Sequence, residues 1–156
     1  WGKTEACVYQ GLSVYYCHNT HVAEVADITM ENGVPNVKKV TCAIDCGIVI
    51  NPMGAMNQAK GGVIDGIGHA LYSDFGFSNG IPQSNNFNTY QLIRMGQTPK
   101  VDVHFIESNI DPTGLGEPTL PPVGAAVANA IYKATGKRLT KQPYISNMNV
   151  SEKVLG

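Results

Sequence analysis

Residues 37–72 read VKKVTCAIDCGIVINPMGAMNQAKGGVIDGIGHALY, and this stretch joins two kinds of apolar pattern. Its first part, from Val37 to Val49, is rich in β-branched residues, which predicts a strand. Asn51 is a candidate helix cap and Pro52 suits the first helical position, so a helix should begin here. Apolar residues then recur at near-helical spacing to about Tyr72: Met53, Met56, Val63, Ile64, Ile67 and Leu71. The stretch therefore predicts a strand that leads into a long helix.

The predicted helix is unusual in its glycines, which are Gly61, Gly62, Gly66 and Gly68. Each one costs about 1 kcal/mol relative to alanine in a helix interior. Something must therefore approach this helix too closely for side chains to fit between. A neighbouring backbone and a ligand are the two candidates.

The residues before this stretch also carry a strand pattern. A β-branched run extends from Val22 to Met30, and apolar residues precede it at Val8, Val14 and Tyr16. Glu31-Asn32-Gly33 predicts a hairpin turn, because asparagine and glycine tolerate positive φ. Residues 6–50 are thus expected to form strands.

Further elements are expected after the helix. Ser78-Asn79-Gly80 predicts a second hairpin turn, and a short strand is expected near Tyr90 to Arg94. From Lys100 to Ile106 apolar and polar residues alternate, which indicates a half-buried strand. A loop rich in glycine and proline, Asn109 to Pro121, precedes a helix that should begin at Pro122 and end at Gly136. The residues that this helix should turn inward are Val123, Val127, Ala130, Ile131 and Ala134.

These elements predict a single α+β domain over residues 1–156, with a mixed or antiparallel sheet and two main helices packed on it. Residues 141–156 are weakly patterned. We expect this tail to be loosely ordered or to pack on a part of the protein outside this chain.

The composition is that of one ordinary globular domain, with 156 residues of which 43% are hydrophobic and 15% charged. The net charge is -1 and no basic run is longer than Lys137-Arg138, so no nucleic acid partner is expected. No apolar run reaches the roughly 18 residues that a membrane helix needs. The chain starts at Trp1 without a signal-peptide pattern, and we expect it to be a piece of a longer protein.

The four cysteines are Cys7, Cys17, Cys42 and Cys46, and none forms a C-x-x-C pair. Cys42 and Cys46 fall in an extended segment, where four residues span about 13 Å, which is too far for a disulfide. Most of these cysteines are expected to be buried small apolar side chains.

The sharpest local feature is Gly114-Leu115-Gly116-Glu117-Pro118, which should hold a carboxylate rigidly before a helix. Glu117 can either cap that helix or act as a base in a cleft, and spacing alone favours capping. Gln58, beside Gly61 and Gly62, can bind a polar ligand, although a lone glutamine on a helix is more often only solvated.

The histidines offer less. His18 and His21 are three residues apart in an expected strand, where they would point to opposite faces, so a shared metal ion is not predicted. His69 and His104 are single residues and are interpreted as structural.

Three segments form an ordered set: Ala43 to Pro52 with Gln58 and Gly61-Gly62; Gln83-Ser84-Asn85 with Tyr90 and Leu92 to Met95; and Gly114 to Pro118 with Pro121-Pro122, Ala126 to Ile131 and Ala134 to Arg138. In this order they resemble the molybdenum-cofactor-binding large subunit of the xanthine dehydrogenase superfamily. The resemblance is to its isoquinoline 1-oxidoreductase beta subunit and membrane-associated aldehyde dehydrogenase branch, and to the C-terminal part of such a subunit. It covers roughly Val22 to Pro143.

The resemblance reverses both local interpretations. It implies that Glu117 is the general base that removes a proton from a hydroxyl on molybdenum, with its carboxylate buried so that basicity is raised. It also implies that Gln58 and Gly116 bind the cofactor, and it implies no metal ligand in this chain. Lys60 and Asn88-Thr89 depart from the pattern of the family, which leaves substrate and partner details open.

The resemblance further implies an oxidoreductase that hydroxylates an aldehyde or an N-heterocycle, with water as the oxygen source. The cofactor is molybdenum-molybdopterin, with the cytosine dinucleotide as a candidate form. No iron-sulfur ligand pattern is present here, so those clusters are expected on a small partner subunit. The remainder of the large subunit and a cytochrome c are further candidate partners, and the compartment, cytoplasmic or periplasmic, stays open because relatives are often exported.

The isolated chain is expected to be inactive. Two alternatives remain: a noncatalytic domain that serves subunit assembly, and a free-standing small-molecule binding protein. The second alternative needs a pocket that closes within these 156 residues.

Overall fold

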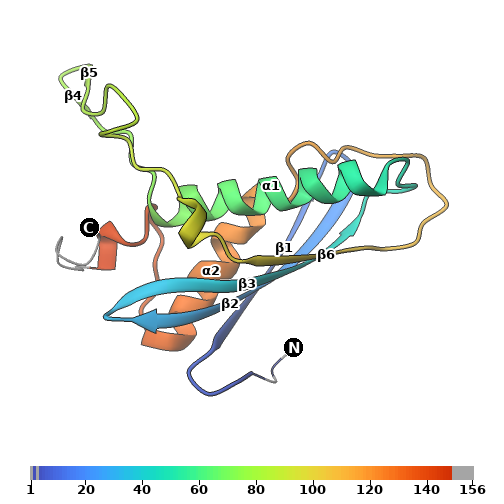
Figure 1. The fold of residues 1–156 in the computed structure, drawn as a ribbon, viewed down its shortest axis with the longest axis horizontal. Helices are drawn as coiled ribbons and strands as arrows, with labels where there is room; N and C mark the ends of the chain where they lie inside the picture. The colour runs from blue at the N-terminus through green and yellow to red at the C-terminus, as the bar shows by residue number, and fades with distance from the viewer. Residues whose placement is uncertain (1, 3, 149–156) are drawn as a thin grey trace.

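The structure is a computed structural model that describes residue 2 and residues 4–148 (Figure 1). The strand expected to reach Val49 ends at Asp45, and a helix begins at Pro52 after a short connection. The Asn51 side chain accepts a hydrogen bond of 3.0 Å from the Gly54 N–H and so caps the helix that follows. The two main helices are α1 (Pro52–Leu71) and α2 (Leu120–Thr135). Gly136 ends α2 with a φ of 73°, as predicted.

The main sheet has four strands in the order β1-β2-β3-β6. Their bounds are β1 (Tyr9–Cys17), β2 (Thr20–Glu31), β3 (Val34–Asp45) and β6 (Lys100–Phe105). The first three strands pair antiparallel, and β6 runs parallel to β3 after the crossover through α1. This mixed sheet with two helices confirms the predicted α+β class.

Both helices cover the same face of the sheet, and the core lies between them and the strands. Ile28 and Val40 of the sheet meet Ile67 of α1 and Val127 and Ile131 of α2, all fully buried. Burial of side chains of this size contributes about 2 kcal/mol each. The predicted inward residues of α2 are therefore confirmed, except that Ala134 is only half-buried.

Both predicted hairpin turns are present. Asn32 and Gly33 have φ values of 52° and 81°, and Asn79 and Gly80 have values of 51° and 77°. The second turn joins two short strands, β4 (Phe77–Ser78) and β5 (Ile81–Pro82), which project away from the main body (Figure 1).

The strand expected near Tyr90 to Arg94 is wrong. This segment has no strand partner among the described residues, and a strand needs one to satisfy its backbone. The Ile93 side chain instead packs over Gly68 of α1, and a short 3-10 helix, η1 (Met95–Gln97), follows.

The glycines of α1 are explained largely by a close neighbour. A Cβ on Gly62 would lie 2.3 Å from Thr119 Oγ1, and one on Gly66 would lie 2.4 Å from the Leu120 carbonyl oxygen. On Gly68 it would lie 3.2 Å from Ile93. Protein atoms thus cause three of the four expected close approaches, whereas nothing lies within 4 Å of a Cβ on Gly61.

All four cysteines are free. Cys42 and Cys46 are buried, Cys17 is half-buried, and Cys7 is exposed because it lies on a turn before β1, so burial holds for two of the four cysteines rather than for most of them.

The weakly patterned tail is described only up to residue 148. Within that part Tyr144 is buried, and its backbone N–H donates to the Ala70 carbonyl at 2.7 Å. A short 3-10 helix, η2 (Ser146–Met148), follows, and residues 149–156 of the tail lie outside the described residues. Among the described helices, none is long and apolar enough to cross a membrane.

An ionisable side chain lies inside the core, on β2. Glu24 is 0% exposed, and its Oε1 accepts a hydrogen bond of 3.5 Å from Sγ of Cys42, its register partner on β3. Its Oε2 has no hydrogen-bond partner among the described residues. Burial raises the pKa of Glu24 to about 8, since the charged form loses its hydration, and the bond from Cys42 lowers it by less. The carboxyl group is therefore mostly protonated at neutral pH.

The contact at Gly66 predicts opposite effects for two identical substitutions in α1. Gly66→Ala should lower the free energy of unfolding by about 2 kcal/mol, because overpacking outweighs the gain in helix propensity. Gly61→Ala, where the space is open, should raise it by about 1 kcal/mol. Urea unfolding measures both changes, and a stabilised Gly66→Ala chain would contradict the close approach.

Glu24 predicts a specific dependence of stability on pH. Between pH 4.5, the usual pKa of the group, and about pH 8, the unfolded chain loses the Glu24 proton while the folded chain keeps it. Folding stability should therefore fall as the pH rises through this window, by on the order of 4 kcal/mol in total. Urea unfolding at both ends of the window should show this fall in the wild type and a much smaller one in Glu24→Gln. Parallel curves for the two chains would show that Glu24 is ionised in the fold.

Candidate functional site

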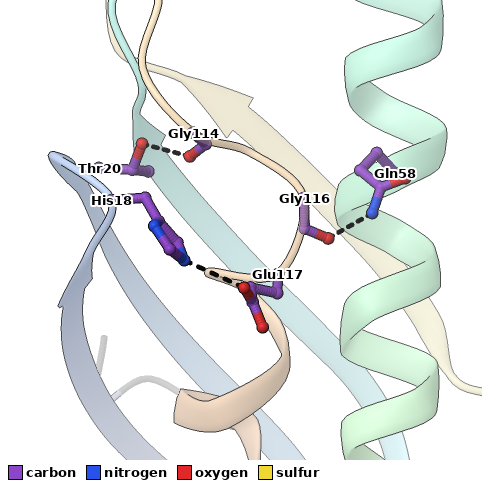
Figure 2. A network of polar contacts seen from close by, with 6 residues as sticks. All are labelled: His18, Thr20, Gln58, Gly114, Gly116 and Glu117. Atoms are coloured by element: carbon purple, nitrogen blue, oxygen red, sulfur yellow. Dashed lines mark hydrogen bonds and ion pairs between the residues drawn. The ribbon is translucent and has the colours of Figure 1, made fainter.

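Glu117 lies in the loop between β6 and α2, three residues before the helix begins at Leu120. Its carboxylate is hydrogen-bonded to the His18 ring, with 3.0 Å between Oε1 and Nε2, rather than to a backbone N–H of α2 (Figure 2). The backbone of Glu117 does take part in the start of the helix, since its carbonyl accepts from the Leu120 N–H at 3.0 Å. The capping role that spacing alone favoured for the side chain is therefore wrong, and α2 starts two residues before the expected Pro122.

The β1–β2 hairpin holds this loop on one side. Thr20 is fully buried, and its hydroxyl donates to the Gly114 carbonyl at 2.6 Å and lies 2.7 Å from the Thr113 hydroxyl. The Gly114 N–H donates in turn to the His18 carbonyl at 3.1 Å. A Cβ on Gly114 would lie 2.5 Å from the His18 Cβ, so only glycine permits this approach.

Helix α1 holds the loop on the other side. The Gln58 side-chain amide donates to the Gly116 carbonyl, so the structure brings together these two predicted residues (Figure 2). Three residues after Gly116, the buried Thr119 hydroxyl donates to the Ala59 carbonyl at 3.1 Å. The loop is thus tied to the hairpin and to α1 at the same time.

The expected burial of the Glu117 carboxylate is not observed. The side chain is 70% exposed and that of His18 is 55% exposed, because the loop lies at the rim of the described fold. Gln58 is exposed as well. The described residues therefore do not close a pocket around Glu117, which counts against a free-standing small-molecule binder.

A surface depression lies beside Gln58 on the α1 side of the loop. Its lining residues are Gly54, Asn57, Gln58, Gly61, Gly62, Asp65, Gly116 and Leu120. The depression offers amide side chains and glycine backbone, and nothing lies within 4 Å of a Cβ on Gly61 or Gly116. This donor set and this open backbone fit a polar group that hydrogen-bonds closely to the chain, such as a pterin. Among the described residues, no group of three His, Cys, Asp or Glu side chains could hold a metal ion.

His18 is the site residue that sequence reasoning missed. The sequence predicts a strand at His18, but His18 forms a two-residue hairpin turn with Asn19, and their φ values are 53° and 60°. The available signal was the His-Asn pair between two strand patterns, since both residue types are enriched at positive φ. His21 instead lies against the Tyr16 ring, with 4.6 Å between ring centroids.

The other two histidines lie apart from this loop. His69 faces Asp65 one turn away on α1, with 3.7 Å between Nε2 and Oδ2. His104 is exposed on β6.

Comparisons with a family model and with curated proteins point to the same family. A family model described as a molybdopterin cofactor-binding domain matches residues 3–99, a range that includes Gln58 and ends before Glu117. A curated relative, the membrane-bound aldehyde dehydrogenase (pyrroloquinoline-quinone) of Gluconacetobacter polyoxogenes, is 38% identical over 78% of this chain and 16% of its own length. Isoquinoline 1-oxidoreductase subunit beta of Brevundimonas diminuta is 33% identical over 85% of this chain and 17% of its own length.

Solved structures agree in fold. Quinoline 2-oxidoreductase from Pseudomonas putida 86 superimposes with a TM-score of 0.75 at 20% identity, over 85% of this chain and 19% of that one. Aldehyde oxidoreductase from Desulfovibrio gigas superimposes with a TM-score of 0.64 at 28% identity, over 80% of this chain and 14% of that one.

The chain spans about a sixth of the length of the two curated relatives described above. The resemblance to the molybdenum-binding large subunits of the xanthine dehydrogenase superfamily, which the three sequence segments predicted, is confirmed by these matches. Since the family model covers well over half of its residues, the chain belongs to the molybdopterin cofactor-binding domain family.

Proposed function

We propose that this chain forms part of the active site of a molybdenum hydroxylase, which oxidises an aldehyde or an N-heterocycle with water as the oxygen source. The observation that carries the proposal is the hydrogen bond from Gln58 to the Gly116 carbonyl. It places the amide of α1 and the loop of Glu117 at one surface depression, although the two residues are 58 positions apart.

In this proposal Glu117 is the general base. Its carboxylate stands at the rim of the loop, and the loop is tied down on both sides, which are the conditions for presenting a base to a bound substrate. Gln58 and Gly116 bind the cofactor. One N–H of the Gln58 amide is taken by Gly116, so its second N–H and its carbonyl oxygen are left for a ligand.

The molybdenum-molybdopterin cofactor, with the cytosine dinucleotide as a candidate form, supplies the two-electron oxidation chemistry when bound. The electrons would leave through iron-sulfur clusters on a small partner subunit, with a cytochrome c as a further candidate acceptor. The names of relatives support the substrate class, since they include an aldehyde dehydrogenase, an isoquinoline oxidoreductase and a nicotinate dehydrogenase. One of these names carries pyrroloquinoline quinone instead of molybdenum, so metal analysis is part of the test.

Because Glu117 is exposed, residues outside the described part of this chain would have to complete the pocket around it. The described part of this chain supplies one wall, namely the loop, the hairpin turn and the start of α1. The remainder of the large subunit would supply the other wall and exclude water, and the isolated chain would be inactive. Exclusion of water is what raises the basicity of a carboxylate and strengthens its interactions.

A noncatalytic assembly domain is the second candidate function. It is favoured by the apolar surface on β1, where Leu12, Val14 and Tyr16 are 43%, 74% and 57% exposed. Exposed apolar patches are a feature of interaction sites, protein–protein contacts among them. Such a domain would keep the fold and the contacts of the sheet without needing Glu117.

Replacing Glu117 separates these two functions. In the full-length subunit assembled with its partners, Glu117→Gln should lower kcat by at least about 100-fold, since a general base of this kind contributes that much. Aldehyde-dependent dye reduction measures the rate, and mass spectrometry measures molybdenum in the same samples. An unchanged rate with full molybdenum content would rule out Glu117 as the general base and favour the assembly domain. Absence of molybdenum from the mature wild type would overturn the proposal of a molybdenum hydroxylase.

The proposed role of Gln58 predicts that its replacement lowers the amount of bound cofactor and not the rate alone. Gln58→Leu keeps the size of the side chain but removes its hydrogen bonds, so molybdenum content should fall about tenfold under limiting cofactor, as for other lost hydrogen bonds around a metal. Gln91→Leu, at another exposed glutamine, is the matched control and should retain full content. Equal molybdenum in the two variants would contradict the cofactor role of Gln58.

A further inference from the structure

The Glu117 side chain has His18 as its hydrogen-bond partner in the described part of the chain. The 3.0 Å between Nε2 and Oε1 is a full hydrogen bond, made by two residues that are 99 positions apart in the sequence. Either the neutral imidazole with a proton on Nε2 or the imidazolium can donate in this geometry. The carboxylate is left with Oε2 as its second oxygen.

The backbone fixes the place of the His18 ring. His18 stands at the first position of a two-residue turn with a φ of 53°, so the β1–β2 hairpin sets the position of its backbone and Cβ. Its carbonyl accepts from the Gly114 N–H, and its Cβ fills the space that a side chain at Gly114 would need. The bond from Thr20 to the Gly114 carbonyl locks the same two segments together. The contacts between the β1–β2 turn and the loop at Gly114 therefore hold His18 close to Glu117.

Stability does not explain this contact. Both side chains are more than half exposed, and exposed ion pairs contribute between about 0 and 1 kcal/mol. A glutamate side chain otherwise samples several rotamers at such a site, and a bond at one oxygen selects among them. The effect of the contact is thus on where the carboxylate points, which is the property that a general base needs.

We propose that His18 is a positioning residue for Glu117: His18 donates from Nε2 to Oε1 of Glu117 and leaves Oε2 as the oxygen that accepts the proton removed by the base. The inference rests on the proposed role of Glu117 as the base. His18 itself neither takes up that proton nor contacts the cofactor in this assignment. Tyr15 lies at the same corner, where the charges of Cys17 and, to a smaller extent, Glu117 act with burial to raise the Tyr15 pKa.

The experiment compares four variants of the full-length subunit assembled with its partners, with rates expressed per bound molybdenum. His18→Phe removes the donor and keeps a ring, and His18→Gln keeps a neutral donor. His104→Phe is the matched control, because His104 is exposed on β6 away from the loop. Glu117→Gln tests the base itself.

His18→Phe should lower kcat about tenfold with KM within about twofold, because a misdirected base weakens only the transition state. His18→Gln should recover most of the loss, and His104→Phe should match the wild type. A merely structural role would instead lower the amount of loaded enzyme and leave the rate per molybdenum unchanged.

A second readout is independent of activity. In a crystal structure of the full-length wild type, Nε2 of His18 should lie within hydrogen-bond distance of Glu117, and in His18→Phe the carboxylate should occupy more than one position. A wild-type structure in which Glu117 turns away from His18 overturns the inference. Equal rates for His18→Phe and His104→Phe, with a greatly lowered rate for Glu117→Gln, would also overturn the inference. That outcome would leave the proposed role of Glu117 as the general base standing. A fully active Glu117→Gln overturns the base and the inference with it.

Discussion

The contact between α1 and the start of α2 is the constraint on which both the fold and the site depend. At Gly62 and Gly66 the two segments approach so closely that a single methyl group would collide with Thr119 or with the Leu120 carbonyl. The Thr119 hydroxyl donates a hydrogen bond to the Ala59 carbonyl and so fixes the start of α2 against α1. Because Glu117 lies only two residues before Thr119, this packing also sets where the carboxylate can lie. Glycines that weaken α1 as an isolated helix therefore serve the tertiary arrangement.

The core contains a second carboxyl group, that of Glu24 on β2. Glu24 and Glu117 have the same side chain, but they lie in different environments. Glu24 is fully buried against Cys42 and holds its proton up to about pH 8, whereas Glu117 is exposed and bonded to an imidazole. Only the exposed group is on a loop that solvent or substrate can reach. The buried group lowers stability as pH rises, so its place in β2 is a cost that the surrounding apolar core offsets.

Local signals were sufficient for most of the fold. The cap at Asn51, the turn at Asn32-Gly33 and the stop at Gly136 each depend on residues adjacent in sequence, and all three occur as predicted. The failures are non-local. The strand expected near Tyr90 lacks a partner, and the bond between His18 and Glu117 joins residues 99 positions apart, which no spacing rule could connect. The resemblance assigned both Gln58 and Gly116 to cofactor binding, but the hydrogen bond between them was not predicted.

The exposure of Glu117 bears on how such a site is built. The hairpin, α1 and the loop already hold the carboxylate and the Gln58 amide in a fixed relation within this chain, before any other wall is added. Orientation and dielectric are thus separable contributions. The described residues provide the orientation, which depends on backbone contacts at Gly114 and Gly116, while a low dielectric requires that water be excluded from the open side. In the proposed active site, a carboxylate that is oriented in advance would need no reorganisation on closure, so the closing wall would only have to remove solvent.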